Sequence, residues 1–265
     1  MARDLVLAVV PLRLASSRLP RKILADVAGL PLAARSLARV HAAFRDDARA
    51  RVIAAVDDEE TFEALRRHSL GTEVVMTDPS LPSGSDRVFA AVQHLLKREA
   101  GLRDEIAAVL NVQGDMPFAG ADGLRQVGEY LRAAPPEVAI ATLATPWPEG
   151  RPYADVSAVK VLANREGRAL YFSRLAIPYT ATAVPEQGPY EGRLHLGVYG
   201  YRLEALARFC AQAPVASERA ESLEQLRALW LGLDIQVLET QAGEGESYRG
   251  VDTAEDLAWA RAFAK

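Results

Sequence analysis

The sequence predicts an α/β protein in which helices flank a mainly parallel sheet. Apolar runs of strand length alternate along the chain with stretches that place apolar side chains at helical spacing, as in parallel α/β folds. The apolar runs are continuous, which is typical of strands buried on both faces. The clearest run covers 107–110 and ends abruptly in the polar turn residues 111–115.

The first half of the chain alternates regularly between strand and helix. We expect strands at 5–10, 51–56, 73–76 and 107–110, and helices at 31–44, 59–69 and 88–98. Pro31 suits the first turn of its helix, where a backbone N–H would have no partner within the helix. This alternation predicts a sheet whose polar loops gather at the carboxyl ends of the strands.

The second half is less regular. We expect helices at 122–133, 203–211, 222–231 and 253–263, and strands at 138–144, 156–162 and 235–238. Thr253 is placed to cap the last helix. Between 169 and 201, short β-rich pieces carry Pro178, Pro185, Gly188 and Gly192. We therefore expect one domain over 1–265, with a β-rich insertion at roughly 163–203 that leaves the sheet and returns.

The composition excludes several classes of partner. The chain has 265 residues, of which 25% are charged, and a formal net charge of −4. This argues against nucleic acid as a partner, because binding to its backbone needs a basic face. No run approaches the ~20 apolar residues of a membrane helix, and no signal peptide is recognised. With Cys210 as the only cysteine, no intrachain disulfide forms, and we expect a soluble cytoplasmic protein without a membrane partner.

A basic loop follows the first predicted strand. Arg13, Arg18 and Lys22 lie there with Ser16 and Ser17. Cations, hydroxyls and backbone N–H groups that converge in a strand-to-helix loop suit a polyphosphate. The chain lacks the glycine patterns of a Walker loop or a dinucleotide site. The alternative is a solvated basic loop without a ligand.

Two aspartates are candidate metal ligands. Asp115 follows the buried strand at 107–110, and Asp252 lies ahead of the last helix. Mg²⁺ commonly takes one or two carboxylates together with phosphate oxygens. The alternative for each aspartate is a helix cap. The same alternative, an ordinary cap, applies to the small residues at 83–87, where Ser83 and Arg87 begin a helix.

A second group of polar residues lies among apolar ones in the second half of the chain. An arginine with tyrosine, glutamate and glutamine suits a polyhydroxylated acid, since arginine binds the carboxylate and the others bind hydroxyls. For the histidine of this group, the alternative is a hydrogen-bonded core residue. The group consists of Arg174, His195, Tyr199, Glu224, Gln225 and Arg227.

Eight segments together resemble the sugar-acid cytidylyltransferase family, in order and nearly end to end. Residues 11–22 resemble its P-A-R-x-x-S-x-R-L-P-x-K loop, and 111–117 resemble its N-V-Q-G-D-E-P turn. The remaining segments are 83–87, 158–161, 169–178, 195–201, 223–229 and 250–257. A single motif of this kind is weak, but eight in register are highly specific.

The resemblance implies a Rossmann-like nucleotide-diphospho-sugar transferase fold with a β-rich subdomain that carries the contact of a homodimer, to which Trp230 adds apolar area. It implies CTP as one substrate, Kdo (3-deoxy-manno-octulosonate) as the sugar acid, and Mg²⁺ as the cofactor. CTP would be bound by Arg13, Ser17, Arg18, Lys22, Ser83, Arg87 and Gln113, and Mg²⁺ by Asp115 and Asp252. The sugar acid would be bound by Gln113, Arg174, His195, Tyr199, Glu224, Gln225 and Arg227.

The implied reaction is direct nucleotidyl transfer, in which the anomeric hydroxyl attacks the α-phosphorus of CTP and pyrophosphate leaves. Arg13, Lys22 and Asp115 would be its catalytic residues. Two alternatives stay open: the same chemistry on another acceptor, such as 8-amino-Kdo or a nonulosonate, and a non-catalytic nucleotide-binding relative.

The chain departs from the family pattern at six positions: Leu12, Val56, Leu81, Pro82, Met116 and Ser157. At Met116 the family has a glutamate, so this position removes a carboxylate beside the expected metal site. None of the six removes an expected metal ligand or a cation of the basic loop, and we therefore expect activity to survive. They bear instead on the choice of sugar acid.

Overall fold

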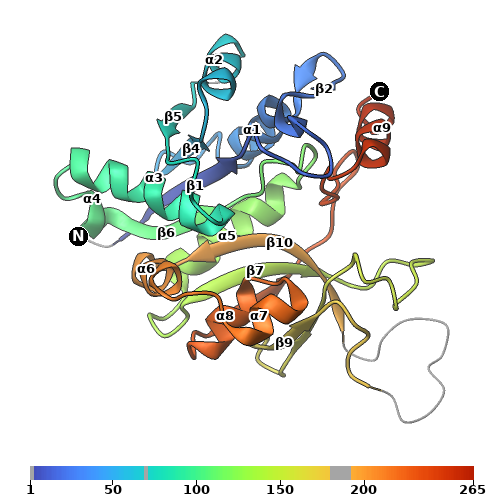
Figure 1. The fold of residues 1–265 in the computed structure, drawn as a ribbon. Coiled ribbons are helices and arrows are strands. Elements are labelled where there is room, and N and C mark those ends of the chain that lie inside the picture. The colour runs from blue at the N-terminus through green and yellow to red at the C-terminus, as the bar shows by residue number, and fades with distance from the viewer. Residues whose placement is uncertain (1–2, 69–70, 180–191) are drawn as a thin grey trace.

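A mixed sheet runs through the centre of the molecule (Figure 1). The computed structural model describes residues 3–68, 71–179 and 192–265. The strands of the sheet are β1 (Leu5–Leu12), β4 (Ala50–Val56), β5 (Glu73–Met76), β6 (Ile106–Asn111), β7 (Ile140–Thr145), β8 (Lys160–Ala163), β9 (Ala169–Ser173), β10 (Arg193–Tyr201) and β11 (Ile235–Glu239). The main path is β11-β7-β10-β6-β1-β4-β5, and β8 and β9 extend from β10. The predicted α/β class is confirmed.

Helices cover both faces of the sheet. They are α1 (Leu32–Ala43), α2 (Glu59–Arg67), α3 (Gly84–Arg98), α4 (Leu102–Glu105), α5 (Ala121–Ala133), α6 (Leu203–Ala211), α7 (Ala216–Glu221), α8 (Gln225–Trp230) and α9 (Ala254–Phe263), with a short 3₁₀ turn η1 (Lys22–Leu24) and a small hairpin of β2 (Asp26–Val27) and β3 (Leu30–Pro31). Successive residues of β1 point to opposite faces, so Leu7 packs in the core under α3 and α6, and Val6 in the core under α1 and α5.

Along its main path, the sheet is parallel except where β10 enters it. β10 pairs antiparallel with β6 on one side and with β7 on the other, whereas β1 pairs parallel with β4 and β6. A bulge between His195 and Tyr199 interrupts the β10–β7 pairing, and Gly197 lies in it with a φ of 70°. A left-handed φ is readily adopted by glycine and strained for other residues, so the glycine allows β10 to bend there.

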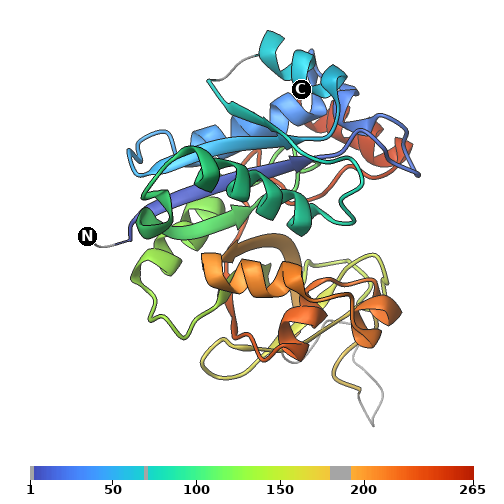
Figure 2. The same cartoon turned by 60° about the vertical axis from the view of Figure 1, so that its left-hand side comes forward.

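The β-rich part of the chain forms a second end of the molecule. β8 and β9 pair antiparallel, and in both views they lie with α7 and α8 away from α1, α2 and α9 (Figures 1 and 2). The small sheet begins at Lys160, slightly ahead of the predicted boundary near 163, and β10 returns into the main sheet. Residues 180–191 of the expected insertion lie outside the described residues.

Three of the predicted elements differ from the structure by three residues or more. The helix predicted at 88–98 is α3, which begins at Gly84. The helix predicted at 222–231 is the short α8, which begins only at Gln225. A separate helix that was not predicted, α7, precedes it and ends at Ser222, which has a left-handed φ of 52°. The strand predicted at 156–162 begins only at Lys160. Residues 155–158 form a turn, since the Asp155 side chain accepts hydrogen bonds from the Ser157 backbone and hydroxyl.

Candidate active site

A pocket of about 910 Å³ lies at the carboxyl ends of β1, β4 and β6. Ligands of parallel α/β sheets collect at this edge, where the loops after the strands meet. The pocket is lined by every residue that the sequence assigned to CTP or the metal: Arg13, Ser17, Arg18, Lys22, Ser83, Arg87, Gln113, Asp115 and Asp252. The fold thus brings together residues from four separate segments, although their roles stay predictions.

Lys22 joins the two candidate metal ligands. Its Nζ donates to Asp115 Oδ2 at 2.5 Å and to Asp252 Oδ1 at 2.8 Å, and its side chain is only 13% exposed. Arg18 Nη2 lies 3.0 Å from the other oxygen of Asp252. Burial lowers the pKa of Lys22, but the two carboxylates outweigh it and the net pKa is raised. Lys22 is therefore charged at neutral pH, between two carboxylates that face each other.

Gly114 allows Asp115 to reach the pocket. A Cβ on Gly114 would lie 2.8 Å from the carbonyl oxygen of Pro11 and 2.4 Å from Leu12 Cδ2. No larger residue fits there, because the contact is with the backbone of β1. The backbone carbonyl of Asp115 also accepts a hydrogen bond from Val251 N at 2.9 Å, which holds the segments of Asp115 and Asp252 side by side.

Arg87 is buried beneath the basic loop. Its Nη1 donates to Thr77 Oγ1 at 2.5 Å, and its Nη2 lies 3.1 Å from Asp57 Oδ2 without a well-aligned hydrogen bond. The other oxygen of Asp57 accepts from the Leu14 backbone N–H at 3.0 Å. Burial lowers the pKa of Arg87, which Asp57 opposes.

Asp57 is a further residue of this site and was not among those predicted from the sequence. It lines the pocket and links Arg87 on α3 to the start of the basic loop at Leu14. A signal for it was present, because two aspartates follow the strand at 51–56 in the same way that Asp115 follows its own strand. Arg21 also lines the pocket and pairs with Glu60 on α2.

Ser83 caps a helix as well as lining the pocket. Its Oγ accepts from the Asp86 backbone N–H at 3.2 Å and donates to the Asp86 carboxylate at 2.7 Å. This is the capping alternative that the sequence left open, and it is compatible with a position at the pocket wall.

The second group of predicted residues, for the sugar acid, does not line this pocket apart from Gln113. His195 is half-buried on β10. Thr142 Oγ1 donates to the Val198 carbonyl at 2.6 Å, so its contact of 2.9 Å with His195 Nε2 must be a hydrogen bond donated by the imidazole. Burial lowers the pKa of His195 to about 3. The ring is therefore neutral and carries its proton on Nε2.

Glu224 lies in a buried polar network between α3 and α8. The Ser85 hydroxyl donates to Glu224 Oε2 at 2.8 Å and accepts from Asn111 Nδ2 at 3.3 Å. Burial raises the pKa of Glu224. Tyr199 packs against the His195 ring and is 8% exposed. Of these predicted sugar-binding groups, Tyr199 is buried, whereas His195 and Glu224 are half-buried.

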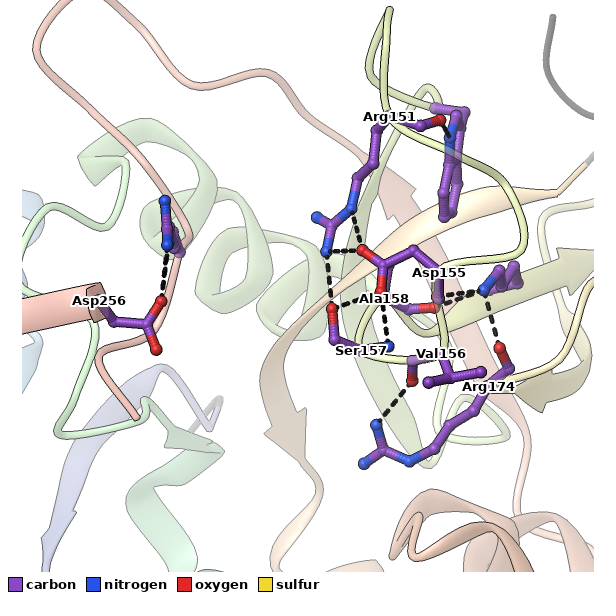
Figure 3. Close-up of polar contacts among 10 residues, drawn as sticks. Arg151, Asp155, Val156, Ser157, Ala158, Arg174 and Asp256 are labelled. Carbon is purple, nitrogen blue, oxygen red and sulfur yellow. Dashed lines mark hydrogen bonds and ion pairs between the residues drawn. The ribbon is translucent and has the colours of Figure 1, made fainter. Parts of the chain in front are cut away.

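Arg174 and Arg227 are both held by other parts of the chain. Arg174 donates from Nη1 to the Val156 carbonyl at 3.2 Å and from Nε to the Glu221 carbonyl at 2.9 Å; Figure 3 shows the first of these contacts. Arg227 is 3% exposed and forms a buried ion pair with Glu218 at 2.5 Å. Gln225, on the same helix as Arg227, is also buried. The carboxylate-binding role of either arginine stays a prediction.

Three of the six departures from the family pattern fall in the core, and the other three are half-buried or exposed. Leu12 and Val56 are fully buried, and Met116 is 8% exposed with its methyl group 3.4 Å from the place of a Cβ on Gly197. Met116 therefore packs as a core residue rather than lying beside Asp115 in solvent. Ser157 is exposed and completes the turn at Asp155 (Figure 3).

The arrangement as a whole defines a class of site. The site combines several cations with two facing carboxylates at the carboxyl edge of a parallel sheet, and a separate polar region lies around β10. This combination suits the transfer of a nucleotide between two substrates.

Among the described residues, no helix is long and apolar enough to cross a membrane.

Comparison with known proteins shows the family to which the chain belongs. The family model described as "Cytidylyltransferase" matches residues 7–235. The 3-deoxy-manno-octulosonate cytidylyltransferase of Polynucleobacter asymbioticus is 40% identical over 251 residues, which are 95% of this chain and 92% of the relative. That of Halorhodospira halophila is 40% identical over 256 residues, which are 94% and 93% of the two chains.

A solved structure gives the same result. It is that of CMP:2-keto-3-deoxy-manno-octonic acid synthetase in complex with CTP, which is 32% identical, covers 98% of both chains and has a TM-score of 0.82. This chain belongs to the cytidylyltransferase family and, within it, to the 3-deoxy-manno-octulosonate cytidylyltransferases.

Proposed function

We propose that this chain transfers CMP from CTP to the anomeric hydroxyl of Kdo, releases pyrophosphate and supplies CMP-Kdo for lipopolysaccharide biosynthesis. The observation that carries this proposal is the convergence of Arg13, Arg18, Lys22 and Asp115 in one pocket. The relatives named for this activity extend over nearly the whole chain and support the same acceptor.

In the proposed reaction, the anomeric oxygen forms a bond to the α-phosphorus as the bond from that phosphorus to the pyrophosphate breaks. Arg13, Arg18 and Lys22 face the pocket and would stabilise the negative charge that develops on the leaving pyrophosphate. No covalent intermediate with the protein is needed, and the hydroxyl gives up its proton to solvent as the new bond forms.

The carboxylates of Asp115 and Asp252 fit a magnesium ion. Both bond one Lys22 ammonium, so their oxygens face a common point, and carboxylates are hard ligands of the kind that Mg²⁺ takes together with phosphate oxygens. When bound, the ion would offset charge on the phosphates and lower the pKa of the attacking hydroxyl. Lys22 and Arg18 neutralise these carboxylates within the chain itself.

The test is pyrophosphate release by the purified protein with CTP, MgCl₂ and Kdo. We expect release that depends on all three components, and CMP-Kdo identified by mass spectrometry. Release with 8-amino-Kdo or a nonulosonate but not with Kdo would change the acceptor and keep the chemistry. CTP binding in calorimetry without release from any acceptor would indicate a non-catalytic relative.

We also propose that the protein is a homodimer that uses its β-rich end. Val156, Leu170, Leu175 and Trp230 are each at least 58% exposed there, and exposed apolar side chains of this size are typical of an interface between proteins when they form one patch. We expect light scattering to give the mass of a dimer, and Leu175→Glu to give a monomer. A monomeric wild-type protein at micromolar concentration would contradict this. The cytoplasmic location expected from the sequence stays a prediction.

A further inference from the structure

Lys22 is at the same time a cation of the basic loop and the bridge between Asp115 and Asp252. We propose that Lys22 competes with the metal ion for these two carboxylates, so that the metal gains access to them together with the nucleotide and not before it. This inference rests on the proposed function, because it concerns how the same site is loaded.

The geometry requires competition. Lys22 Nζ lies 2.5 Å from Asp115 Oδ2 and 2.8 Å from Asp252 Oδ1. A magnesium ion binds carboxylate oxygens at about 2.0–2.1 Å and needs the space directly in front of them. The ammonium fills that space, and two cations cannot share it at such distances without strong repulsion.

The charges around the two carboxylates are already balanced. The two positive charges of Lys22 and Arg18 balance the two negative charges of Asp115 and Asp252. The Lys22 ammonium is mostly buried, so its attraction to the carboxylates is only weakly screened by solvent. A metal ion alone would have to displace a well-placed ammonium, which lowers its apparent affinity.

A triphosphate changes this balance. Lys22 and Arg18 both line the pocket that we assign to CTP, and each has a flexible side chain that a phosphate group can attract. Once the phosphates attract the ammonium, the carboxylates are left without a counter-charge and a metal ion becomes the favoured partner. Nucleotide and metal binding are then coupled through one side chain.

The test measures Mn²⁺ binding without nucleotide by electron paramagnetic resonance, since Mn²⁺ accepts the same oxygen ligands as Mg²⁺. We expect Lys22→Met to bind Mn²⁺ on the order of tenfold more tightly than the wild type, because the competing state is removed. Lys22→Gln, which also lacks the charge, should behave in the same way and serves if the methionine variant folds poorly.

Arg21→Met is the matched control. Arg21 lines the same pocket and carries the same charge, but it pairs with Glu60 and not with either carboxylate. Its removal should change Mn²⁺ affinity by less than about threefold, since an exposed charge is screened. Equal gains in the Lys22 and Arg21 variants, or no gain at Lys22, would overturn the proposal.

A double variant locates the ion. Adding Asp115→Asn to Lys22→Met should remove the gained affinity, and Mn²⁺ binding that stays tight would place the ion elsewhere and overturn the proposal. This readout is independent of turnover. If the wild type releases no pyrophosphate from any acceptor, the proposed function fails, while the Mn²⁺ result still decides the role of Lys22.

Discussion

The Arg87 guanidinium and the Asp57 carboxylate form an ion pair 3.1 Å apart, in which the two side chains are only 2% and 5% exposed. Asp57 also accepts a hydrogen bond from the Leu14 backbone N–H at 3.0 Å. One buried carboxylate therefore connects α3, the end of β4 and the basic loop, and fixes where that loop begins.

Asp57→Asn should destabilise the protein and weaken CTP binding. The substitution leaves the Arg87 charge buried without its partner, which costs about 3–5 kcal/mol of unfolding free energy. Urea denaturation measures this loss, and calorimetry measures the affinity for CTP. The Arg87→Met, Asp57→Asn double variant should lose less than the sum of the single variants. Additive losses would show that the two residues do not act as a pair.

Asp115→Asn should remove activity and leave the fold intact. Losing one of two ligands of the proposed metal should lower turnover by about 10³-fold, equivalent to roughly 4 kcal/mol of transition-state stabilisation. Circular dichroism and urea denaturation should show a folded protein, because Lys22 keeps its second partner, Asp252. Asp122→Asn, on an exposed carboxylate of α5, is the control and should be fully active. Substantial activity of the Asp115→Asn variant would show that Asp115 is not a ligand of the metal.

His195 should make the protein sensitive to acid. Burial lowers the pKa of His195 to about 3 in the folded protein, whereas the ordinary value is 6.5. The unfolded chain therefore takes up a proton below pH 6.5 that the folded chain does not, and stability falls as the pH falls. At pH 5, this loss of unfolding free energy through His195 reaches about 2 kcal/mol.

The measurement is the unfolding free energy in urea at pH 7 and at pH 5. The His195→Gln variant lacks the imidazole, so its loss between the two pH values should be smaller than that of the wild type by this amount. Equal losses in both proteins would mean that His195 takes up its proton in the folded state, as a solvent-accessible histidine would.

Arg227 should behave as a structural residue. Its ion pair with Glu218 is buried, and its guanidinium also lies 4.3 Å from the centre of the Phe209 ring. Arg227→Met and Glu218→Gln should each cost about 3–5 kcal/mol in urea denaturation, since each leaves a buried charge unpaired. The exposed Arg219 of the neighbouring helix gives a control, Arg219→Met, with little effect.

The Michaelis constant for the sugar acid distinguishes the two roles of Arg227. If the ion pair is structural, Arg227→Met and Glu218→Gln should change this constant to a similar extent. A much larger increase in Arg227→Met alone would show that the guanidinium binds the acceptor directly, as the resemblance implies.

The first half of the fold followed from the sequence because its signals are local. The apolar run before Asn111 and the helix after Pro31 show periodicities that depend only on neighbouring residues, and both elements form as expected. The short helix α7 and its end at Ser222 were not predicted, since a left-handed residue other than glycine leaves no clear sequence signal.

The sequence by itself determined the α/β class, the basic loop and the two aspartates of this protein. These features could be predicted because the polar residues follow their strands directly along the chain, where a local pattern reveals them. Only the tertiary structure decided that Lys22 lies between Asp115 and Asp252, residues 93 and 230 positions away. It also decided that His195 bonds Thr142 and that the buried Arg227 pairs with Glu218. Contacts between distant segments depend on how the sheet is ordered and packed, and no local pattern specifies them.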